Sequence, residues 1–429
     1  MTYRGKFFVA IFSAAIAFFA FSGMVIGWFS ATAQQPINDP GAQIRIFESV
    51  LQHIQNDYVD DPDLEKVRYG ALRGLADGLD PYSAYLTAAQ VKDFQSDEAL
   101  ERVGIGAVFS QVSSYLYVIS VIKDSPADKA GLQAGDVVEY IGTKATRDIS
   151  LYDAKQLVRG DNGSKVKLRV LRTGEKPQTI EVTRGSYKVP NVDAKVENGV
   201  GVIKVYSLEK GEAEDIKNQV QSLKSKNVAK ILLDLRNVSA GGIDEAVAVA
   251  NLFIKDGEIA KVIGRENAVV KIYTADPAKH VFDGNVAALI DLGTAGAGEV
   301  VASAILESKR GDVIGEQSFG AGSKQDLIRL RGGDGLLLTT QKWASISGKP
   351  FLSDKRETAG VKPSKEVKRP ETPEPIEVEE LVEQKEEEDE LDPQIQPEED
   401  EPTVTTPKPK KNQDDFQLKK AIEILNGKK

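Results

Sequence analysis

The chain has 429 residues, enough for more than one domain, and a net charge of −10 with no cysteine. The missing cysteines exclude disulfides and thiolate chemistry, and they remove a common ligand of zinc sites. Residues 371–402 hold 16 acidic residues against one lysine, so the rest of the chain carries a net charge of +5. No basic stripe with interleaved aromatic residues occurs, which argues against nucleic-acid binding. The two histidines, His53 and His280, lie far apart in sequence, and we expect no metal, no cofactor and no Ser-His-Asp triad.

The N-terminus has the composition of a targeting segment. Arg4 and Lys6 precede an uncharged, mostly apolar run over residues 7–29. A helix of that length would be about 35 Å long, enough for a bilayer core of about 30 Å. Residues 31–33, Ala-Thr-Ala, offer a cleavage site, so residues 1–33 are predicted to be a retained signal anchor or, as the alternative, a cleaved signal peptide. In both cases the body is exported, and we expect a bacterial periplasm, with the protein anchored in the inner membrane or, after cleavage, released from it.

Residues 34–99 are predicted to form an N-terminal helical region. Apolar residues recur at helical spacing over 43–58 and again over 64–79, and the second segment ends at Asp80-Pro81.

Residues 100–186 are predicted to form a compact β-rich module. Alternating patterns predict strands over 115–122, 136–141, 165–171 and 178–183. A short helix is expected within 125–136, and an amphipathic helix over 150–159.

Residues 187–363 change to an alternation of strands and helices. Strands are predicted over 201–206, 230–234 and 286–291, and helices over 212–226, 243–253 and 299–306. Such alternation is typical of a sheet with parallel pairs covered by helices.

The remaining residues are predicted to be a tether and a helix. Residues 364–413 hold eight prolines and dense glutamate, which predicts a disordered acidic linker. Residues 414–429 contain an aspartate cap followed by Leu418, Ala421, Ile422 and Leu425 on one face, typical of an amphipathic helix.

The β-rich module resembles a PDZ domain. The string from Ser125 to Asp136, Ser-Pro-Ala-Asp-Lys-Ala-Gly-Leu-Gln-Ala-Gly-Asp, is specific for that family. The resemblance implies that a peptide adds to it as an extra strand, and that a glycine-containing loop binds the terminal carboxylate through backbone N–H groups. The matching residues are Val103, Gly104, Ile105 and Gly106. In the alternative interpretation the two glycines only permit a tight turn.

Several segments after residue 187 resemble the C-terminal processing (tail-specific) serine peptidases. These segments are residues 232–246, 292–306, 315–325 and the closing Gly-Val-Lys-Pro at 360–363. The resemblance implies an α/β core of the ClpP/crotonase type with an inserted PDZ domain. The family uses a serine nucleophile with a lysine base.

The resemblance assigns a role to each position of the expected catalytic site. Gly296 stands where the family has the nucleophile, and Ala321 stands where it has the base. Gln325 matches a glutamine that helps to hold the lysine. The backbone N–H groups of Gly241 and Ala297 match the oxyanion hole, although the segment before Gly241 lacks the family's proline and is one residue longer.

Glycine and alanine supply neither an oxygen nucleophile nor a basic amine, so the sequence predicts loss of peptidase activity. The preferred interpretation is a membrane-anchored homologue that binds protein or peptide C-termini, or that regulates an active protease relative. One alternative is an active serine endopeptidase with a rewired site, for which Thr294, Ser303 and Lys324 are the candidate residues. Another alternative is a structural scaffold that binds no peptide.

Overall fold

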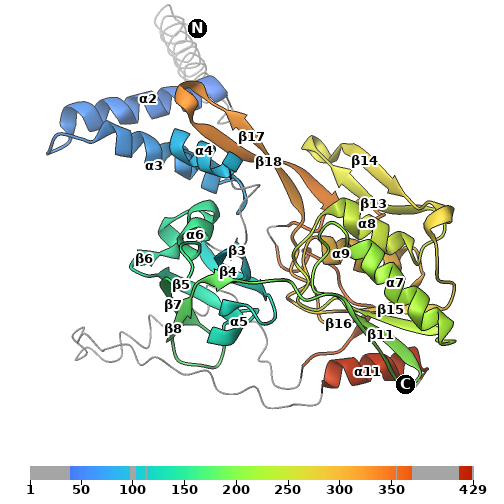
Figure 1. The fold of residues 1–429 in the computed structure, drawn as a ribbon. Coiled ribbons are helices and arrows are strands. Elements are labelled where there is room, and N and C mark those ends of the chain that lie inside the picture. Colours follow the sequence, from blue (N-terminus) through green and yellow to red (C-terminus); the bar gives the residue numbers. More distant parts are fainter. Residues whose placement is uncertain (1–38, 97–102, 113, 354, 370–414, 428–429) are drawn as a thin grey trace, which may run out of the picture. The chain divides into compact units, whose positions relative to one another are not determined.

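The computed structural model describes residues 39–96, 103–112, 114–353, 355–369 and 415–427 (Figure 1). The chain divides into two compact units, residues 1–71 and 72–429. The predicted signal segment, residues 1–33, lies outside the described residues. Among the helices that are described, none combines the length and apolar character needed to cross a membrane.

The first unit contains the first of the two predicted N-terminal helices. This helix, α2 (Pro40–Asp57), begins where the side chain of Asp39 accepts hydrogen bonds from the N–H groups of Gly41 and Ala42. The helix α3 (Leu64–Asp77) continues from the first unit into the second. Both helices are confirmed near their predicted bounds.

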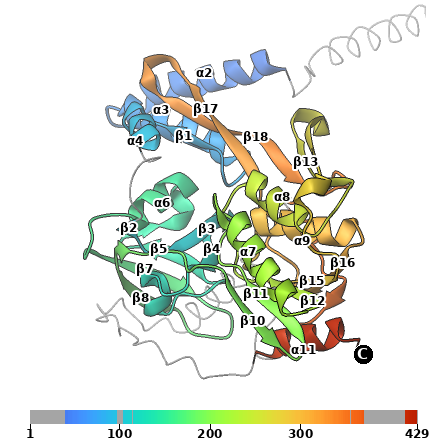
Figure 2. The same cartoon turned by 45° about the vertical axis from the view of Figure 1, so that its right-hand side comes forward.

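The second unit begins with β1 (Ala84–Leu86) and α4 (Ala88–Ser96), followed by an antiparallel sheet (Figure 2). The order of this sheet is β3-β4-β5-β7-β8, and β6 pairs with β5. Its elements are β3 (Ala107–Val112), β4 (Tyr115–Val121), β5 (Val137–Ile141), β6 (Lys144–Ala145), β7 (Lys165–Leu171) and β8 (Gln178–Thr183). A short pair, β2 (Val103–Gly104) and β9 (Gly185–Ser186), joins the two ends of the module. The helices are α5 (Pro126–Ala130) and α6 (Leu151–Val158).

The alternation predicted for this module is visible in β7. Val166, Leu168 and Val170 are buried, whereas the residues between them are exposed. Ser150 caps α6 by accepting a hydrogen bond from the N–H of Asp153. The four predicted strands and both helices are therefore confirmed.

A second sheet follows the order β10-β11-β12-β15-β16-β19, in which all pairs except β10–β11 are parallel. Its strands are β10 (Asp193–Glu197), β11 (Val200–Lys204), β12 (Lys230–Asp234), β15 (Asn285–Ile290), β16 (Gly311–Gly315) and β19 (Lys365–Glu366). The helices α7 (Glu212–Ser225), α8 (Ile243–Asn251) and α9 (Ala297–Glu307) lie between the strands in sequence.

Both faces of the parallel sheet are buried, as expected when helices cover it on two sides. Residues 231 and 233 of β12 pack into the large core with α7, α8 and α9. Leu232 between them packs into a separate cluster with the C-terminal helix α11 (Phe416–Leu425). In Figure 1, α11 accordingly lies along this sheet, where it contacts β12, β15 and β16. The predicted C-terminal helix is confirmed.

A third sheet has the order β1-β18-β13-β14, and β17 pairs with β18. Its remaining strands are β13 (Glu258–Ile263), β14 (Val269–Thr274), β17 (Ser323–Arg329) and β18 (Gly335–Ala344). The sequence analysis predicted none of these strands.

The start of the acidic linker, placed at residue 364, is corrected by the structure. Lys365–Glu366 form β19 beside β16, and Val367 is buried in the cluster beneath α11. The hydroxyl of Ser364 accepts a hydrogen bond from the N–H of Val313. The buried side chain of Val367 and these hydrogen bonds hold residues 364–367 against the sheet, although their composition alone predicts a disordered linker. The rest of the predicted linker, residues 370–413, lies outside the described residues.

Candidate functional site

Gly296, at the expected nucleophile position, is the residue immediately before α9. Its backbone angles are φ 52° and ψ −106°, a conformation that residues with a side chain rarely adopt. A Cβ at this position would lie 3.6 Å from the Trp343 ring and 4.0 Å from the carbonyl oxygen of Ser239, which are ordinary contacts. The position therefore has space for a side chain, while the backbone favours glycine.

Glu299 connects the nucleophile segment to the base segment. The side chain is fully buried. One carboxylate oxygen, Oε1, accepts hydrogen bonds from the Ser318 hydroxyl at 2.6 Å and from the N–H of Gly320 at 2.7 Å. The other, Oε2, accepts from the N–H of Gly296 at 2.8 Å and from that of Ala321 at 2.9 Å. Burial raises the pKa of Glu299 to about 7, although these hydrogen bonds act in the opposite direction.

Ala321, at the expected base position, is in an apolar environment. It is 8% exposed and packs in a small cluster with Ile119 of β4 and with Ala295. The predicted retained residue, Gln325, donates hydrogen bonds to the hydroxyl of Ser323 and to a threonine hydroxyl of β18. Its amide is therefore held by hydroxyl groups.

The candidates for a rewired site have other contacts. The Thr294 hydroxyl is fully buried and donates to the carbonyl of Leu235 at 2.9 Å. The Ser303 hydroxyl donates to a carbonyl of its own helix at 3.2 Å. Lys324 is largely exposed and pairs with Asp326 at 3.0 Å. The structure therefore does not bring these three groups together as a nucleophile and a base.

The two expected oxyanion donors lie on adjoining segments. Gly241 forms an isolated β-bridge with Leu208. The backbone φ angle of Gly241 is 131°, and a Cβ added to this residue would lie 2.1 Å from the carbonyl oxygen of Leu208. The neighbouring carbonyl of Ser239 faces Gly296. Among the described residues, no acceptor is found for the N–H of Gly241 or of Ala297. Among the described residues, both backbone donors thus remain available next to Gly296, the expected nucleophile position.

Strand β4 contacts the same region. The side chain of Asn237 accepts a hydrogen bond from the N–H of Val121 at 3.1 Å and donates to its carbonyl at 2.5 Å. The hydroxyls of Ser120 and Ser239 are hydrogen-bonded to each other. Ile119 of β4 also packs on Ala321, so these contacts hold β4 against the expected base position.

The loop expected to bind a carboxylate joins β2 to β3. The side chain of Ile105 is buried in the core of the module. The carbonyls of Ile105 and Gly106 accept hydrogen bonds from the N–H groups of Ala127 and Ile122. No acceptor for the N–H of Ile105 or Gly106 is found in the part of the chain that the structure describes. The loop is thus fixed through its carbonyls, which leaves N–H groups available to a ligand.

Comparison with known proteins identifies the family of this chain. The model of peptidase family S41 matches residues 199–367, and a PDZ domain model matches residues 117–172. The carboxy-terminal-processing protease of Bartonella bacilliformis is 32% identical over 311 residues, which are 71% of this chain and 72% of that protein. This chain belongs to the carboxy-terminal processing protease family. The carboxy-terminal processing protease CtpA of Bacillus subtilis is 29% identical over 344 residues, covering 80% of this chain and 73% of the relative.

A solved structure of the photosystem II D1 C-terminal processing protease shares the fold. Its TM-score is 0.65 at 24% identity, and the match covers 75% of this chain and 86% of that one. The S41 peptidase fold with a PDZ domain, expected from the sequence motifs, is therefore confirmed.

Sequence reasoning missed several residues of the candidate site. Glu299 follows the nucleophile position within the family segment, but three of its four hydrogen bonds come from a loop about twenty residues further along the chain. Trp343 comes from a segment without a functional signal in one sequence, and Asn237 lies in the family-like segment 232–246, whose motif does not reveal its hydrogen bonds to β4. Hydrophobic periodicity could not have indicated them, because each acts through a single side chain in a turn or a strand.

Proposed function

We propose that this chain is a carboxy-terminal processing protease homologue that binds the C-termini of other proteins without cleaving them. The observation that carries this proposal is the chemistry at two positions. Amide hydrolysis by this family's scheme needs an oxygen nucleophile and a neutral amine within hydrogen-bond reach. Gly296 and Ala321 provide neither, and the nearest substitutes, Thr294 and Lys324, are occupied by other partners.

Peptide binding uses atoms that these replacements leave in place. In a PDZ domain, affinity comes from main-chain hydrogen bonds to an edge strand and from N–H groups around the terminal carboxylate. Strand β3 ends its sheet, and the loop of Ile105 and Gly106 has N–H groups without acceptors among the described residues. Both features support retention of binding after loss of cleavage.

The proposed location and partners follow from the sequence. Residues 1–33 would anchor the chain in the bacterial inner membrane, with the body in the periplasm, unless the segment is cleaved. An exported protein that holds C-termini could deliver them to an active relative, or it could keep them from one. The residues of the predicted acidic linker would then act as a tether between the body and α11.

The test is a binding experiment in which the ligand is recovered afterwards. The purified full-length chain is titrated against a fluorescein-labelled ten-residue peptide that ends in Ala-Ala-Val, with the same peptide as a C-terminal amide for control. We expect the anisotropy to rise for the free carboxylate and not for the amide, and mass spectrometry to recover the bound peptide intact. Cleaved peptide, or no difference between carboxylate and amide, would contradict the proposal.

A further inference from the structure

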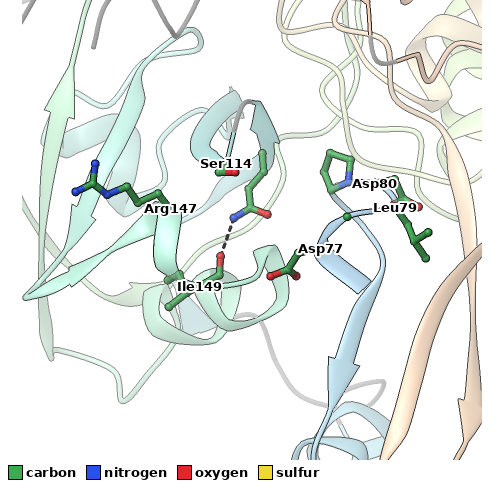
Figure 3. A pocket seen from close by; sticks show the side chains of 9 residues that line it. Asp77, Leu79, Asp80, Ser114, Arg147 and Ile149 are labelled. Carbon is green, nitrogen blue, oxygen red and sulfur yellow. Dashed lines mark hydrogen bonds between the residues drawn. The ribbon is translucent and has the colours of Figure 1, made fainter. Parts of the chain in front are cut away.

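A peptide that adds to the module as an extra strand would lie between β3 and α6, a place called the groove below. Strand β3 pairs only with β4 in its sheet, and α6 packs beside it. The loop of residues 103–106 lies at the start of β3. At the other end, a pocket of about 310 Å³ is lined by residues 77–81, Gln111 and Ser114 of the β3–β4 hairpin, and Arg147 and Ile149 before α6. Figure 3 shows Ile149 and Arg147 on the module side of this pocket, with Asp77 and Asp80 opposite.

The C-terminal end of α6 lies at the carboxylate loop. Arg159 follows α6, and its Cγ lies 3.9 Å from the point where a Cβ on Gly104 would be. Lys155 precedes Arg159 by four residues, and the two cations are near enough for the charge of Arg159 to act on the Lys155 amine. The groove therefore has a second cation one helical turn away from the loop.

Lys155 is half-buried, and no hydrogen-bond or ion-pair acceptor for its amine is found among the described residues. Burial and, to a smaller extent, the positive charge of Arg159 together lower the pKa of Lys155 to about 8. A partly desolvated cation without a counter-ion costs free energy, and a carboxylate supplied by a ligand would recover part of that cost.

The spacing identifies the ligand residue that would meet Lys155. The four-residue step from Arg159 back to Lys155 corresponds to a rise of about 6 Å along the helix axis. Two residues of an added strand span about 6.7 Å, and alternate side chains of that strand face the helix. If the terminal carboxylate is bound at the loop, the side chain opposite Lys155 belongs to the third residue from the C-terminus.

We propose that Lys155 makes this groove selective for protein C-termini whose third-from-last residue is aspartate or glutamate. The inference rests on the proposed function, because it requires that the groove binds C-termini at all. It adds a chemical class of partner, namely extended, exported tails with an acidic side chain at that position.

The test uses the full-length chain and three labelled ten-residue peptides that differ only at the third-from-last position. They end in Glu-Ala-Val, Gln-Ala-Val and Lys-Ala-Val. A charge pair in a partly desolvated groove predicts about five- to tenfold tighter binding of the glutamate peptide than of its glutamine isostere at pH 7. The lysine peptide should bind more weakly than either.

Variants separate the role of this lysine from general electrostatics. Lys155→Met should bring the glutamate and glutamine peptides to equal affinity, and Lys155→Glu should reverse their order. Lys167→Met removes one exposed lysine from β7 of the same module, away from the groove, and should keep the wild-type preference.

The outcomes distinguish the two proposals. Equal affinity of the wild type for the glutamate and glutamine peptides, with both bound better than amides, would overturn this inference alone. Absence of binding by all free-carboxylate peptides would overturn both. A preference for glutamate that survives Lys155→Met would also refute the role of Lys155.

Discussion

Glu299 should make the stability of the core depend on pH in an unusual direction. Its pKa in the folded chain is raised from the ordinary 4.5 to about 7 because the carboxyl is fully buried. The folded state therefore holds this proton more tightly than the unfolded state. The resulting contribution to stability is fully present below pH 4.5 and is lost as the pH rises to about 7. A difference of this size corresponds to about 3 kcal/mol.

The perturbation is Glu299→Gln, which keeps the shape of the side chain and removes its titration. We expect the free energy of unfolding of the wild type, relative to this variant, to fall by about 3 kcal/mol between pH 4.5 and 7.5. The assay is urea unfolding followed by tryptophan fluorescence, because Trp343 lies beside Gly296 and reports on this region. Other titrating groups are common to both proteins and cancel in the difference.

The control is Glu307→Gln, which removes a more exposed carboxylate at the other end of the same helix. Its difference from the wild type gives the baseline for the loss of a carboxylate from the same helix, and the pH dependence of the Glu299→Gln difference should exceed it. Parallel pH profiles for the wild type and Glu299→Gln would refute the reasoning, because they would mean that the hydrogen-bond donors around Glu299 keep it ionised at low pH.

Two further predictions concern the loop beside Gly296, the expected nucleophile position. Gly241→Ser should destabilise the fold by about 3 kcal/mol or more, because its Cβ would lie 2.1 Å from a carbonyl oxygen at positive φ. The control is Gly242→Ser, where an added Cβ would have no atom within 4 Å and the residue is the N-cap of α8, so the thermal midpoint should change little. Equal losses of stability in the two variants would contradict the predicted clash at Gly241. The variant Asn237→Gly keeps the left-handed backbone but lacks the two side-chain hydrogen bonds to Val121, so the rate of amide hydrogen exchange in β4 should rise about tenfold. The control Asn227→Gly, at another left-handed asparagine, should leave that rate unchanged.

The elements with strong local patterns could be predicted from the sequence. The predicted strand over residues 230–234 matches β12 in full, and the helices α7 and α8 end within two residues of their predicted bounds. These segments have continuous apolar runs or helical periodicity, which a single sequence displays directly. The family motifs predict the nucleophile position at Gly296 and the base position at Ala321, and the N–H groups of both residues donate to Glu299 in the structure.

The strands β13, β14, β17 and β18 could not be predicted in the same way. Strand β14 has both of its valines exposed, and β17 is mostly polar, so neither shows the alternation of a half-buried strand. β13 pairs with β14 and β17 with β18 as neighbours along the chain, but the sheet forms only through the pairing of β18 with β13 and β1, which are far away in sequence. The same limit applies to the site, where Glu299 and the loop of Gly320 meet only in the folded chain.

The most direct test of the central claim restores the missing chemistry. The full-length wild type and the double variant Gly296→Ser/Ala321→Lys are incubated with an unstructured protein that has an apolar C-terminus, and cleavage is followed by mass spectrometry. We expect the wild type to leave the substrate intact and the double variant to cut it, because the backbone donors and the groove remain in place. Cleavage by the wild type that is abolished by Thr294→Val or Lys324→Ala would contradict the account, since it would show that the nucleophile or the base has moved.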